Sequence, residues 1–554
     1  MLNGMQKYCA VLVSFSVFLL AGCGGGGGAP IELSSAQLCA SLNGTTIADT
    51  SIGLPTNGGA VTSVELVAPS GTAPTAVGEY CKVLGVIRPV SAGAFDIKFQ
   101  VNLPTTWNSK ALMYGGGGYN GSIPATTAAS AANLVPVDKP VPLGQGYVTF
   151  ASDSGHQFNA GGSRDGSFGI NDEALNNFDG DALKKTRDVA FYLINRRYGG
   201  APSKSYFQGN STGGREALIV IQRWPQDFDG VIAIYPAWNA ATLDLQFGRL
   251  SRAFARPGAY PNENKKKLVY DSVIAACDGL DGVQDGLVSN VAACQFNPAT
   301  IRCPGGADTG DTCLSDAQIA AYNAYNTAIT FNYALESGET QYPGFNVYAG
   351  ADTRGVLNLG TTAPVNSPSN PSILTQPYWG AFYEQWVRFF VTRDPGYLAL
   401  TFDPQNPGIY QQRVSFLTNA QQANGTDLSA FQSKGGKLLM MHGTADALVS
   451  TRATEDYYKR LVTRMSAAKV SDFVRYYEVP GQGHVTGAFA AGWDSVKALE
   501  DWVERGVTPP AQVVADTNTA TKGRTRPMCE YPTWPKYNGT GDVNAAASFA
   551  CVTQ

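Results

Sequence analysis

Four short apolar runs, each ended by turn-forming residues, constrain the fold of this chain more than any other feature. Runs of this length, rich in β-branched and aromatic residues, are typical of strands buried on both faces of a parallel sheet. Between the second and third runs, residues 172–199 have apolar positions that lean toward one helical face. The runs are "KALMY" (110–114), "GYVTFASD" (146–153), "KSYFQG" (204–209) and "GVIAIYP" (230–236). Together they predict an α/β fold.

The same alternation returns near residue 434. "GKLLMMHG" (436–443) and "DFVRYYEVPG" (472–481) are predicted strands, and "TEDYYKRLVTRM" (454–465) and "GWDSVKALEDWVERG" (492–506) are predicted helices. Strands and helices in this order extend a parallel sheet. The sequence therefore predicts one α/β core built from two separated parts of the chain.

The segment between these two parts has a different character. Residues 239–433 show no strand–helix alternation, are rich in Asn, Pro, Tyr and Gly, and contain four cysteines. We interpret this segment as a large insertion that forms a lid domain. The first part of the core then spans 39–238 and the second part 434–554, a division that the chain length allows.

The N-terminus is predicted to be an export signal. Residues 1–22 hold Lys7 and then an apolar run that is too short for a confident membrane span. The run ends in Leu-Ala-Gly before Cys23, which is typical of a lipoprotein processing site, and residues 23–38 would then form a glycine-rich tether. The alternative is ordinary signal cleavage without a lipid at Cys23.

Cysteine content and charge narrow the class of protein. Of ten cysteines, Cys9 and Cys23 lie near the predicted signal, which leaves eight. An even number in an exported chain predicts disulfides, and none of the eight has the C-x-x-C spacing of a zinc site. The net charge is only −4 and no basic block occurs, so a nucleic-acid partner is not expected.

A glycine-flanked serine follows the third predicted strand. Ser211 is the centre of a G-x-S-x-G frame (209–213), and "REALIVIQRW" (215–224) after it is a predicted helix. Strand, tight turn and helix are the context of a nucleophile elbow, in which the first helical N–H, that of Thr212, can face a substrate oxygen. A polar residue in a glycine-rich turn is the alternative, because 62 of the 554 residues are glycine.

A serine nucleophile requires a base and an acid, and few residues qualify. The chain has three histidines, and His484 follows a predicted strand near the C-terminus, where the base of an α/β-hydrolase lies. His442 ends a strand and is interpreted as structural, whereas His156 precedes the serine and is interpreted as local or substrate-facing. Asp446 follows the strand 436–443 and is the predicted acid, with a surface aspartate as the alternative.

A second glycine-rich turn follows the first predicted strand. "MYGGGGYNG" (113–121) places four consecutive glycines well before the serine. Their open backbone N–H groups suit an oxyanion hole, and we predict Gly117 or Gly118 as the second donor beside Thr212. A flexible loop is the alternative.

An acidic turn in the insertion predicts a metal site. "ACDGLDGVQDGLVSNVAAC" (276–294) holds Asp278, Asp281 and Asp285 among glycines. Carboxylates that alternate with backbone carbonyls in a tight loop suit Ca²⁺, although the spacing is not that of an EF-hand. We predict a structural Ca²⁺ rather than a catalytic one, with a solvated acidic turn as the alternative.

These motifs together resemble the tannase and feruloyl esterase family, which includes mono(2-hydroxyethyl) terephthalate hydrolases. The resemblance covers most of the mature chain and rests on "GGGGYNG", "GNSTGGREAL", "CDGLDGVQDGLVSNVAAC", "HGTAD" and "PGQGH". It implies a secreted serine esterase with an α/β-hydrolase core and a lid that shapes the substrate pocket. By this resemblance Ser211, Asp446 and His484 match the catalytic triad, and Thr212 matches an oxyanion donor.

The resemblance also implies a ligand set and a disulfide pairing. Residues Asp278, Asp281, Val283, Asp285 and Leu287 match calcium ligands, the valine and leucine through their backbone oxygens. The implied disulfides are Cys39–Cys81, Cys277–Cys294, Cys303–Cys313 and Cys529–Cys551. The chain departs from the family where a disulfide usually bridges the residue before the serine and the residue after the histidine. Those positions are Asn210 and Val485, so this bridge is absent.

The sequence therefore predicts an exported serine carboxylic-ester hydrolase that acts through an acyl-enzyme, and the family resemblance implies esters of feruloyl, galloyl or terephthaloyl type as its substrates. The aromatic run 377–390 is predicted either to stack a substrate ring or to form core. Within it, Arg388 has two interpretations, a contact with a substrate carboxylate or, preferably, a structural ion pair. The alternative function is a non-catalytic surface lipoprotein that binds aromatic ligands.

Overall fold

The computed structural model describes residues 33–128, 134, 136 and 138–553. The predicted signal peptide, Cys23 and the predicted tether up to residue 32 lie outside the described residues. Among the described residues, no helix combines the length and the apolar content needed to cross a membrane.

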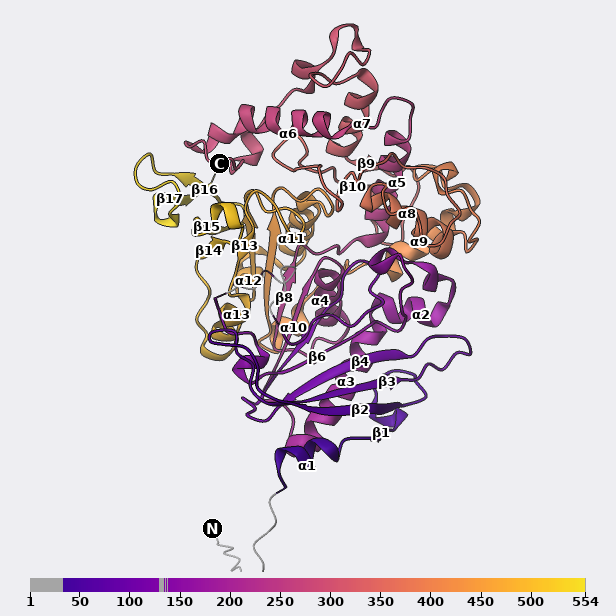
Figure 1. Cartoon of the computed structure of the whole chain (residues 1–554), viewed down its shortest axis with the longest axis vertical. Helices are drawn as coiled ribbons and strands as arrows, with labels where there is room; N and C mark the ends of the chain where they lie inside the picture. Colours follow the sequence, from indigo (N-terminus) through magenta and orange to yellow (C-terminus); the bar gives the residue numbers. More distant parts are fainter. Residues whose placement is uncertain (1–32, 129–133, 135, 137, 554) are drawn as a thin grey trace, which may run out of the picture.

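One 13-stranded sheet runs through the molecule in the order β1-β2-β3-β4-β6-β5-β7-β8-β11-β12-β15-β14-β13 (Figure 1). Its middle strands are parallel, and all six predicted runs form them. They are β6 (Val148–Ser152), β5 (Lys110–Tyr114), β7 (Lys204–Asn210), β8 (Gly230–Ile234), β11 (Lys437–Gly443) and β12 (Val474–Val479).

Antiparallel strands extend the sheet on both sides of this parallel middle. Before it come β1 (Thr46–Ile47), β2 (Gly59–Val67), β3 (Tyr80–Ile87) and β4 (Ile97–Pro104). Beyond β12 lie β15 (Thr525–Glu530), β14 (Gln512–Asp516) and β13 (Ala491–Gly492). The last described strands, β16 (Trp534–Tyr537) and β17 (Phe549–Val552), form a separate hairpin.

Helices cover both faces of the parallel strands, which explains why these strands are apolar throughout. In β11, Leu438 and Met440 join one buried cluster, whereas Leu439 and Met441 join another, because successive side chains point to opposite faces. The first cluster includes residues of α3 (Ala182–Tyr198), α4 (Thr212–Arg223) and α11 (Thr451–Met465). The second includes residues of α13 (Ser495–Arg505). This arrangement is the predicted α/β-hydrolase core.

Most of the chain between β8 and β11 lies over the carboxyl ends of the parallel strands, and its residues 429–433 return to the start of β11 (Figure 1). Its helices are α5 (Ala240–Phe254), α6 (Glu263–Cys277), α7 (Asp316–Asn326), α8 (Tyr378–Gln385), α9 (Gln411–Ala420) and α10 (Ser429–Ser433), with one short hairpin of β9 (Ile329–Thr330) and β10 (Gln341–Tyr342). It forms a buried cluster of its own, which also takes in Tyr119, Phe168 and Phe178 from the core. The insertion is therefore packed onto the core.

Short helices complete the described chain: α1 (Ser35–Ala40), α2 (Asp172–Asn176) and α12 (Ala467–Ser471). Four disulfides link described residues, in the pairing that the family resemblance implied. They are Cys39–Cys81, Cys277–Cys294, Cys303–Cys313 and Cys529–Cys551, with Cα–Cα distances of 5.5, 5.3, 4.8 and 5.6 Å. Each closes a local loop, which limits the freedom of the unfolded chain.

Candidate active site

Ser211 stands in a strained turn between β7 and α4. Its backbone has φ 57° and ψ −120°, a conformation that L-residues rarely adopt and that costs on the order of 1–3 kcal/mol. Three backbone hydrogen bonds hold the turn: Ser211 N–H donates to the Ile234 oxygen at 3.0 Å, and the Ser211 oxygen accepts from Arg215 and Ala237, both at 3.1 Å. The turn presents the serine hydroxyl at the carboxyl end of the sheet.

The two glycines of the G-x-S-x-G frame are required by close backbone packing. A Cβ added to Gly209 would lie 2.1 Å from the Gly213 oxygen, and a Cβ added to Gly213 would lie 2.7 Å from the Gly116 oxygen. Both distances are shorter than van der Waals contact allows. The frame therefore lets β7, α4 and the glycine-rich turn after β5 approach one another.

The predicted triad residues meet although they are far apart in the chain. His484 Nε2 lies 3.1 Å from Ser211 Oγ, and His484 Nδ1 lies 2.7 Å from Asp446 Oδ2. The carboxylate can only accept, so Nδ1 carries the proton and Nε2 is free to accept from the serine hydroxyl. The imidazole also packs on the ring of Tyr235, with the ring centroids 4.6 Å apart.

Asp446 is buried and yet suited to remain ionised. Its side chain is 1% exposed, and Oδ1 accepts backbone N–H groups of Leu448 at 2.8 Å and Val449 at 2.9 Å. Burial alone opposes ionisation, but His484 and His442 outweigh it and hold the pKa of Asp446 below its ordinary value. The aspartate therefore keeps its negative charge at neutral pH.

The other two histidines have structural roles. His442 Nε2 donates to the Val449 oxygen at 3.0 Å, and its Nδ1 accepts from the Thr454 hydroxyl at 2.8 Å, which confirms the structural interpretation. His156 Nε2 lies 2.6 Å from the Tyr119 oxygen, and the ring stacks on Phe168. Burial lowers the pKa of His156 to about 4. His156 does not line the cavity at Ser211, so its local interpretation holds and the substrate-facing one is wrong.

Backbone N–H groups beside the serine hydroxyl are open to a substrate. In the glycine-rich turn, the N–H groups of Gly115 and Gly116 donate within the fold, at 2.9 and 2.8 Å. Those of Gly117, Gly118 and Thr212 have no hydrogen-bond partner among the described residues, and all three residues line the cavity at Ser211. The Thr212 hydroxyl donates to the Gly118 oxygen at 2.6 Å, which ties the turn to α4. The choice between Gly117 and Gly118 as second donor stays open.

A cavity of about 390 Å³ opens at Ser211 and His484, between the core and the insertion. Four of its lining residues, Ala240, Leu243, Asp244 and Phe247, follow the i, i+3, i+4, i+7 spacing of one face of α5. Aromatic rings from other elements complete the wall: Tyr119, Phe178, Tyr378 and Phe382. The α5 residues were not predicted from the sequence, although their helical spacing is visible there.

The predicted aromatic run divides between the core and the cavity. Tyr378 and Phe382 line the cavity, whereas Trp379, Trp386 and most of the remaining rings are buried in the core of the insertion. Arg388 is also buried and does not line the cavity. Its guanidinium lies 3.1 Å from Glu384 and donates to backbone oxygens of three other residues, as the structural interpretation predicted.

The positions that lack the family's disulfide both line the cavity. Asn210 is the last residue of β7, and Val485 follows the histidine with a backbone φ of 71°. A β-branched residue with positive φ is strained, so surrounding contacts must hold this loop. The idea that Asn210 and Val485 replace a covalent tie with packing stays a prediction.

The acidic turn of the insertion folds around its own backbone. Asp278 accepts N–H groups from Asp285, Gly286 and Leu287 at 3.0–3.2 Å, and an oxygen of Asp285 pairs with Arg526. No group of three His, Cys, Asp or Glu side chains that could hold a metal ion occurs among the described residues.

Two observations nevertheless fit a cation at this turn. Asp281 is fully buried, and its carboxylate bonds to the Val283 N–H at 3.1 Å and to the Ser289 hydroxyl, with no lysine or arginine of the described residues paired to it. The backbone oxygens of Val283 and Leu287 accept no hydrogen bond from the described residues. A buried carboxylate without a cation partner is unfavourable unless a ligand compensates its charge.

Comparison with known proteins gives consistent matches over most of the chain. A family model described as "Tannase and feruloyl esterase" matches residues 81–552. The chain is 41% identical to an uncharacterised esterase of Agrobacterium fabrum, covering 94% of this chain and 93% of that protein. It is 31% identical to the mono(2-hydroxyethyl) terephthalate hydrolase of Piscinibacter sakaiensis, covering 87% and 86%. The crystal structure of feruloyl esterase B from Aspergillus oryzae is similar with a TM-score of 0.74 at 25% identity, over 93% of this chain and 100% of that one.

Proposed function

Because the chain belongs to the tannase and feruloyl esterase family and is a carboxylic ester hydrolase, we propose that it cleaves esters of aromatic acids through an acyl-enzyme on Ser211. The observation that carries this proposal is the hydrogen-bonded series from Ser211 to His484 to Asp446 at the edge of a cavity with aromatic walls. The rival function, a binding protein without catalysis, is not favoured because no member of the triad is missing.

The geometry gives each group a role in the reaction. His484 Nε2 takes the hydroxyl proton as Ser211 Oγ attacks the ester carbonyl carbon, and Asp446 stabilises the imidazolium that forms. The N–H groups of Thr212 and of Gly117 or Gly118 bind the oxygen that becomes negative. His484 then gives its proton to the departing alcohol. A water molecule, activated by the same imidazole, attacks the acyl-enzyme and releases the acid.

The polar group at the cavity wall favours an uncharged phenolic acid as the acyl part. Asp244 is 6% exposed, lines the cavity and lies 3.3 Å from the Tyr119 hydroxyl. Burial raises the pKa of Asp244 well above its ordinary value, which favours the protonated carboxyl group. Such a group both donates and accepts hydrogen bonds, so it suits the hydroxyl of a phenol.

A ring that carries a carboxylate is a poorer fit for the same cavity. No lysine or arginine occurs among the described residues that line it, and Arg388 is engaged elsewhere. An anion taken from water without a cation partner loses its hydration without compensation. Among the three acyl types, we therefore favour feruloyl or galloyl esters over terephthaloyl esters that bear a free carboxylate.

Export of the chain is part of the proposal. Four disulfides among the described residues are typical of proteins that fold in an oxidising compartment. Lipidation at Cys23 remains a proposal from the sequence alone.

We also propose that the turn from Asp278 to Leu287 binds a structural Ca²⁺. Support comes from the buried Asp281 carboxylate, which pairs with no lysine or arginine of the described residues, and from the carbonyl oxygens of Val283 and Leu287, which accept no hydrogen bond from those residues. Together with Asp278 and Asp285 these groups would supply the oxygen ligands that Ca²⁺ prefers. The turn follows α6 and lies inside the loop closed by Cys277–Cys294, away from Ser211 in the sequence, so the ion would stabilise the insertion.

The first test concerns the nucleophile. We expect Ser211→Ala to reduce kcat for methyl ferulate and for a chromogenic aryl ester by at least about 10⁴-fold, because triad members act as a unit. The melting temperature should stay within a few degrees of the parent, which separates lost chemistry from lost fold. Turnover within about tenfold of the parent would show that another residue attacks the ester.

The second test concerns Asp244 and compares methyl ferulate with methyl 3,4-dimethoxycinnamate, which lacks the phenolic hydroxyl. We expect Asp244→Leu to lower kcat/KM for ferulate by about 10- to 100-fold and for the dimethoxy ester by less than about threefold. Asp244→Asn is the matched control, because an amide keeps a donor and an acceptor. An equal loss for both esters would remove Asp244 from acyl recognition.

The third test concerns the metal. We expect chelation by EDTA to lower the melting temperature, because a ligand that binds only the folded state stabilises it. Asp281→Asn should lower the melting temperature likewise and make it insensitive to EDTA, whereas Asp308→Asn, at an exposed aspartate of the same insertion, should keep the EDTA response. An unchanged melting temperature in the parent with EDTA would mean that the turn holds no ion.

A further inference from the structure

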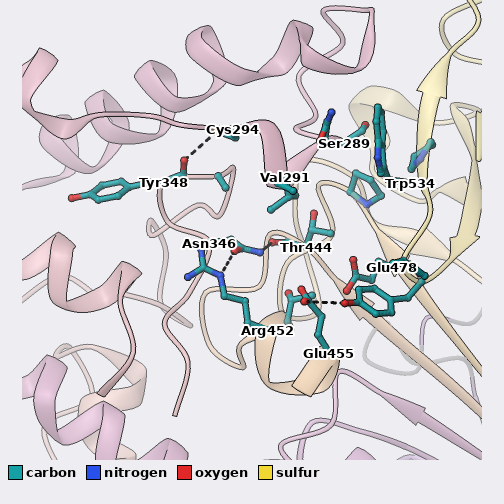
Figure 2. A pocket seen from close by; sticks show the side chains of 18 of the residues that line it. Ser289, Val291, Cys294, Asn346, Tyr348, Thr444, Arg452, Glu455, Glu478 and Trp534 are labelled. Atoms are coloured by element: carbon teal, nitrogen blue, oxygen red, sulfur yellow. Dashed lines mark hydrogen bonds between the residues drawn. The ribbon is translucent and has the colours of Figure 1, made fainter. Parts of the chain in front are cut away.

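A second cavity, of about 720 Å³, lies beside the loop that carries Asp446 (Figure 2). The loop after β11 contributes Thr444 to this cavity and Leu448 and Val449 to the one at Ser211, and no residue lines both. Its volume is in the range of about 300–1,000 Å³ that small-molecule sites occupy. The esterase reaction proposed above makes no use of it.

The walls of this cavity come from separate parts of the chain that disulfides hold in place. Residues 289–296 form one wall and end near Cys294, which is bonded to Cys277. Residues 531–535 form another wall, just after Cys529, which is bonded to Cys551. The rest comes from the first turns of α11, the end of β12, the loop after β11 and four further residues of the insertion: Asn326, Asn346, Tyr348 and Ala349. A cavity built in this way is largely formed before a ligand arrives, which reduces the entropy lost on binding.

Two carboxyl groups at the cavity each have one oxygen that accepts no hydrogen bond from the described residues. Glu478 Oε1 accepts from the Tyr476 hydroxyl at 2.7 Å, and Glu455 Oε2 lies 3.1 Å from Lys459 Nζ and 3.4 Å from the Tyr531 hydroxyl. The second oxygen of each glutamate accepts no hydrogen bond from the described residues. Figure 2 shows both side chains at the same end of the cavity.

The cavity wall also holds a hydrogen-bond donor without an acceptor among the described residues. The buried indole N–H of Trp534 has no acceptor among the described residues, whereas the hydroxyl of Ser289, a residue that is 4% exposed, bonds to the Asp281 carboxylate. In Figure 2, Ser289 and Trp534 lie toward the end of the cavity away from Glu455. Arg452 uses Nε and Nη1 for Asn346 and Asn326, both at 2.9 Å, which fixes its position in the wall. A buried donor without an acceptor is unfavourable by about 1–3 kcal/mol, so a ligand that accepts from it is stabilised.

Flat apolar surfaces stand between these polar groups. The rings of Phe296, Tyr348, Tyr531 and Trp534 and the prolines Pro480 and Pro535 line the same cavity. A ligand that matches this lining must have apolar faces that pack on the rings. It must also have hydroxyl groups at its edge that bond to the unused donors and acceptors of the wall. A sugar ring has both features.

Charge decides between a sugar and an ionic ligand. The Glu455 carboxylate would repel a phosphate or a carboxylate. An organic cation is also a weaker match, because burial and then the charge of Glu455 raise the pKa of Glu478 above its ordinary value, which favours the neutral form of this carboxyl group. A neutral carboxylic acid both donates and accepts, as sugar hydroxyls require.

We propose that this second cavity, between Glu455 and Glu478 at one end and Ser289 and Trp534 at the other, binds a neutral saccharide of one or two sugar units. The site is separate from the esterase cavity, so a bound sugar leaves Ser211 accessible. The site would bind the sugar part of a carbohydrate that carries ester groups, and so keep the enzyme attached to this carbohydrate.

Isothermal titration calorimetry on the disulfide-bonded full chain tests this site with xylobiose and cellobiose as neutral probes and choline as a cationic probe. We expect saturable binding of at least one disaccharide with a Kd of order 1 mM. For choline we expect weaker binding, with a Kd above about 50 mM. Trp534→Ala should weaken disaccharide binding at least about tenfold and leave kcat/KM for methyl ferulate within about twofold. Trp107→Ala, at a half-buried tryptophan outside both cavities, is the matched control and should leave binding unchanged.

A second variant keeps the test decisive if Trp534→Ala does not fold. Glu478→Ala removes a carboxyl group from the other end of the cavity and should also weaken disaccharide binding about tenfold. The proposal is overturned by the absence of saturable binding for both disaccharides, by binding that neither variant weakens, or by tighter binding of choline. None of these results bears on Ser211, so they leave the esterase proposal intact.

Discussion

The positive-φ backbone of Ser211 is the constraint on which the active site depends. This conformation is unfavourable in isolation, and it persists because Ile234, Arg215 and Ala237 bond to the backbone of the same residue. Gly213 then lies so close to Gly116 that no side chain would fit at position 213. One turn therefore fixes the hydroxyl, opens the Thr212 N–H and brings the glycine-rich turn against α4.

The parallel sheet supplies the partners of that turn. Because β7, β8, β11 and β12 are neighbours and parallel, the loops after them meet at one edge of the sheet, and these loops carry Ser211, Asp446 and His484. The insertion after β8 lies over the same edge and closes it with one face of α5. In the proposed reaction the chemistry comes from the α/β-hydrolase core, and the choice of acyl group comes largely from the insertion, with Asp244 as one of its polar groups.

The sequence was informative where one local pattern determines the structure. All six apolar runs became parallel strands because burial on both faces leaves few polar positions, and the elbow was predictable because close packing permits only glycine at positions 209 and 213. The sequence was less informative where distant segments meet. The aromatic run could not be divided between core and cavity, and the face of α5 that bears Asp244 could not be chosen, before their neighbours were known. The second cavity depends on segments that are hundreds of residues apart.

The most direct test of the account is covalent trapping of the nucleophile. The protein is incubated with an aryl phosphonate ester, which a serine activated by histidine attacks to form a stable phosphonyl adduct. The expected result is one adduct per chain, located on Ser211 by peptide mass spectrometry, with ester turnover lost in proportion to labelling. An adduct on any other residue, or full turnover by a chain labelled at Ser211, would contradict the central claim that the strained turn after β7 presents the catalytic nucleophile.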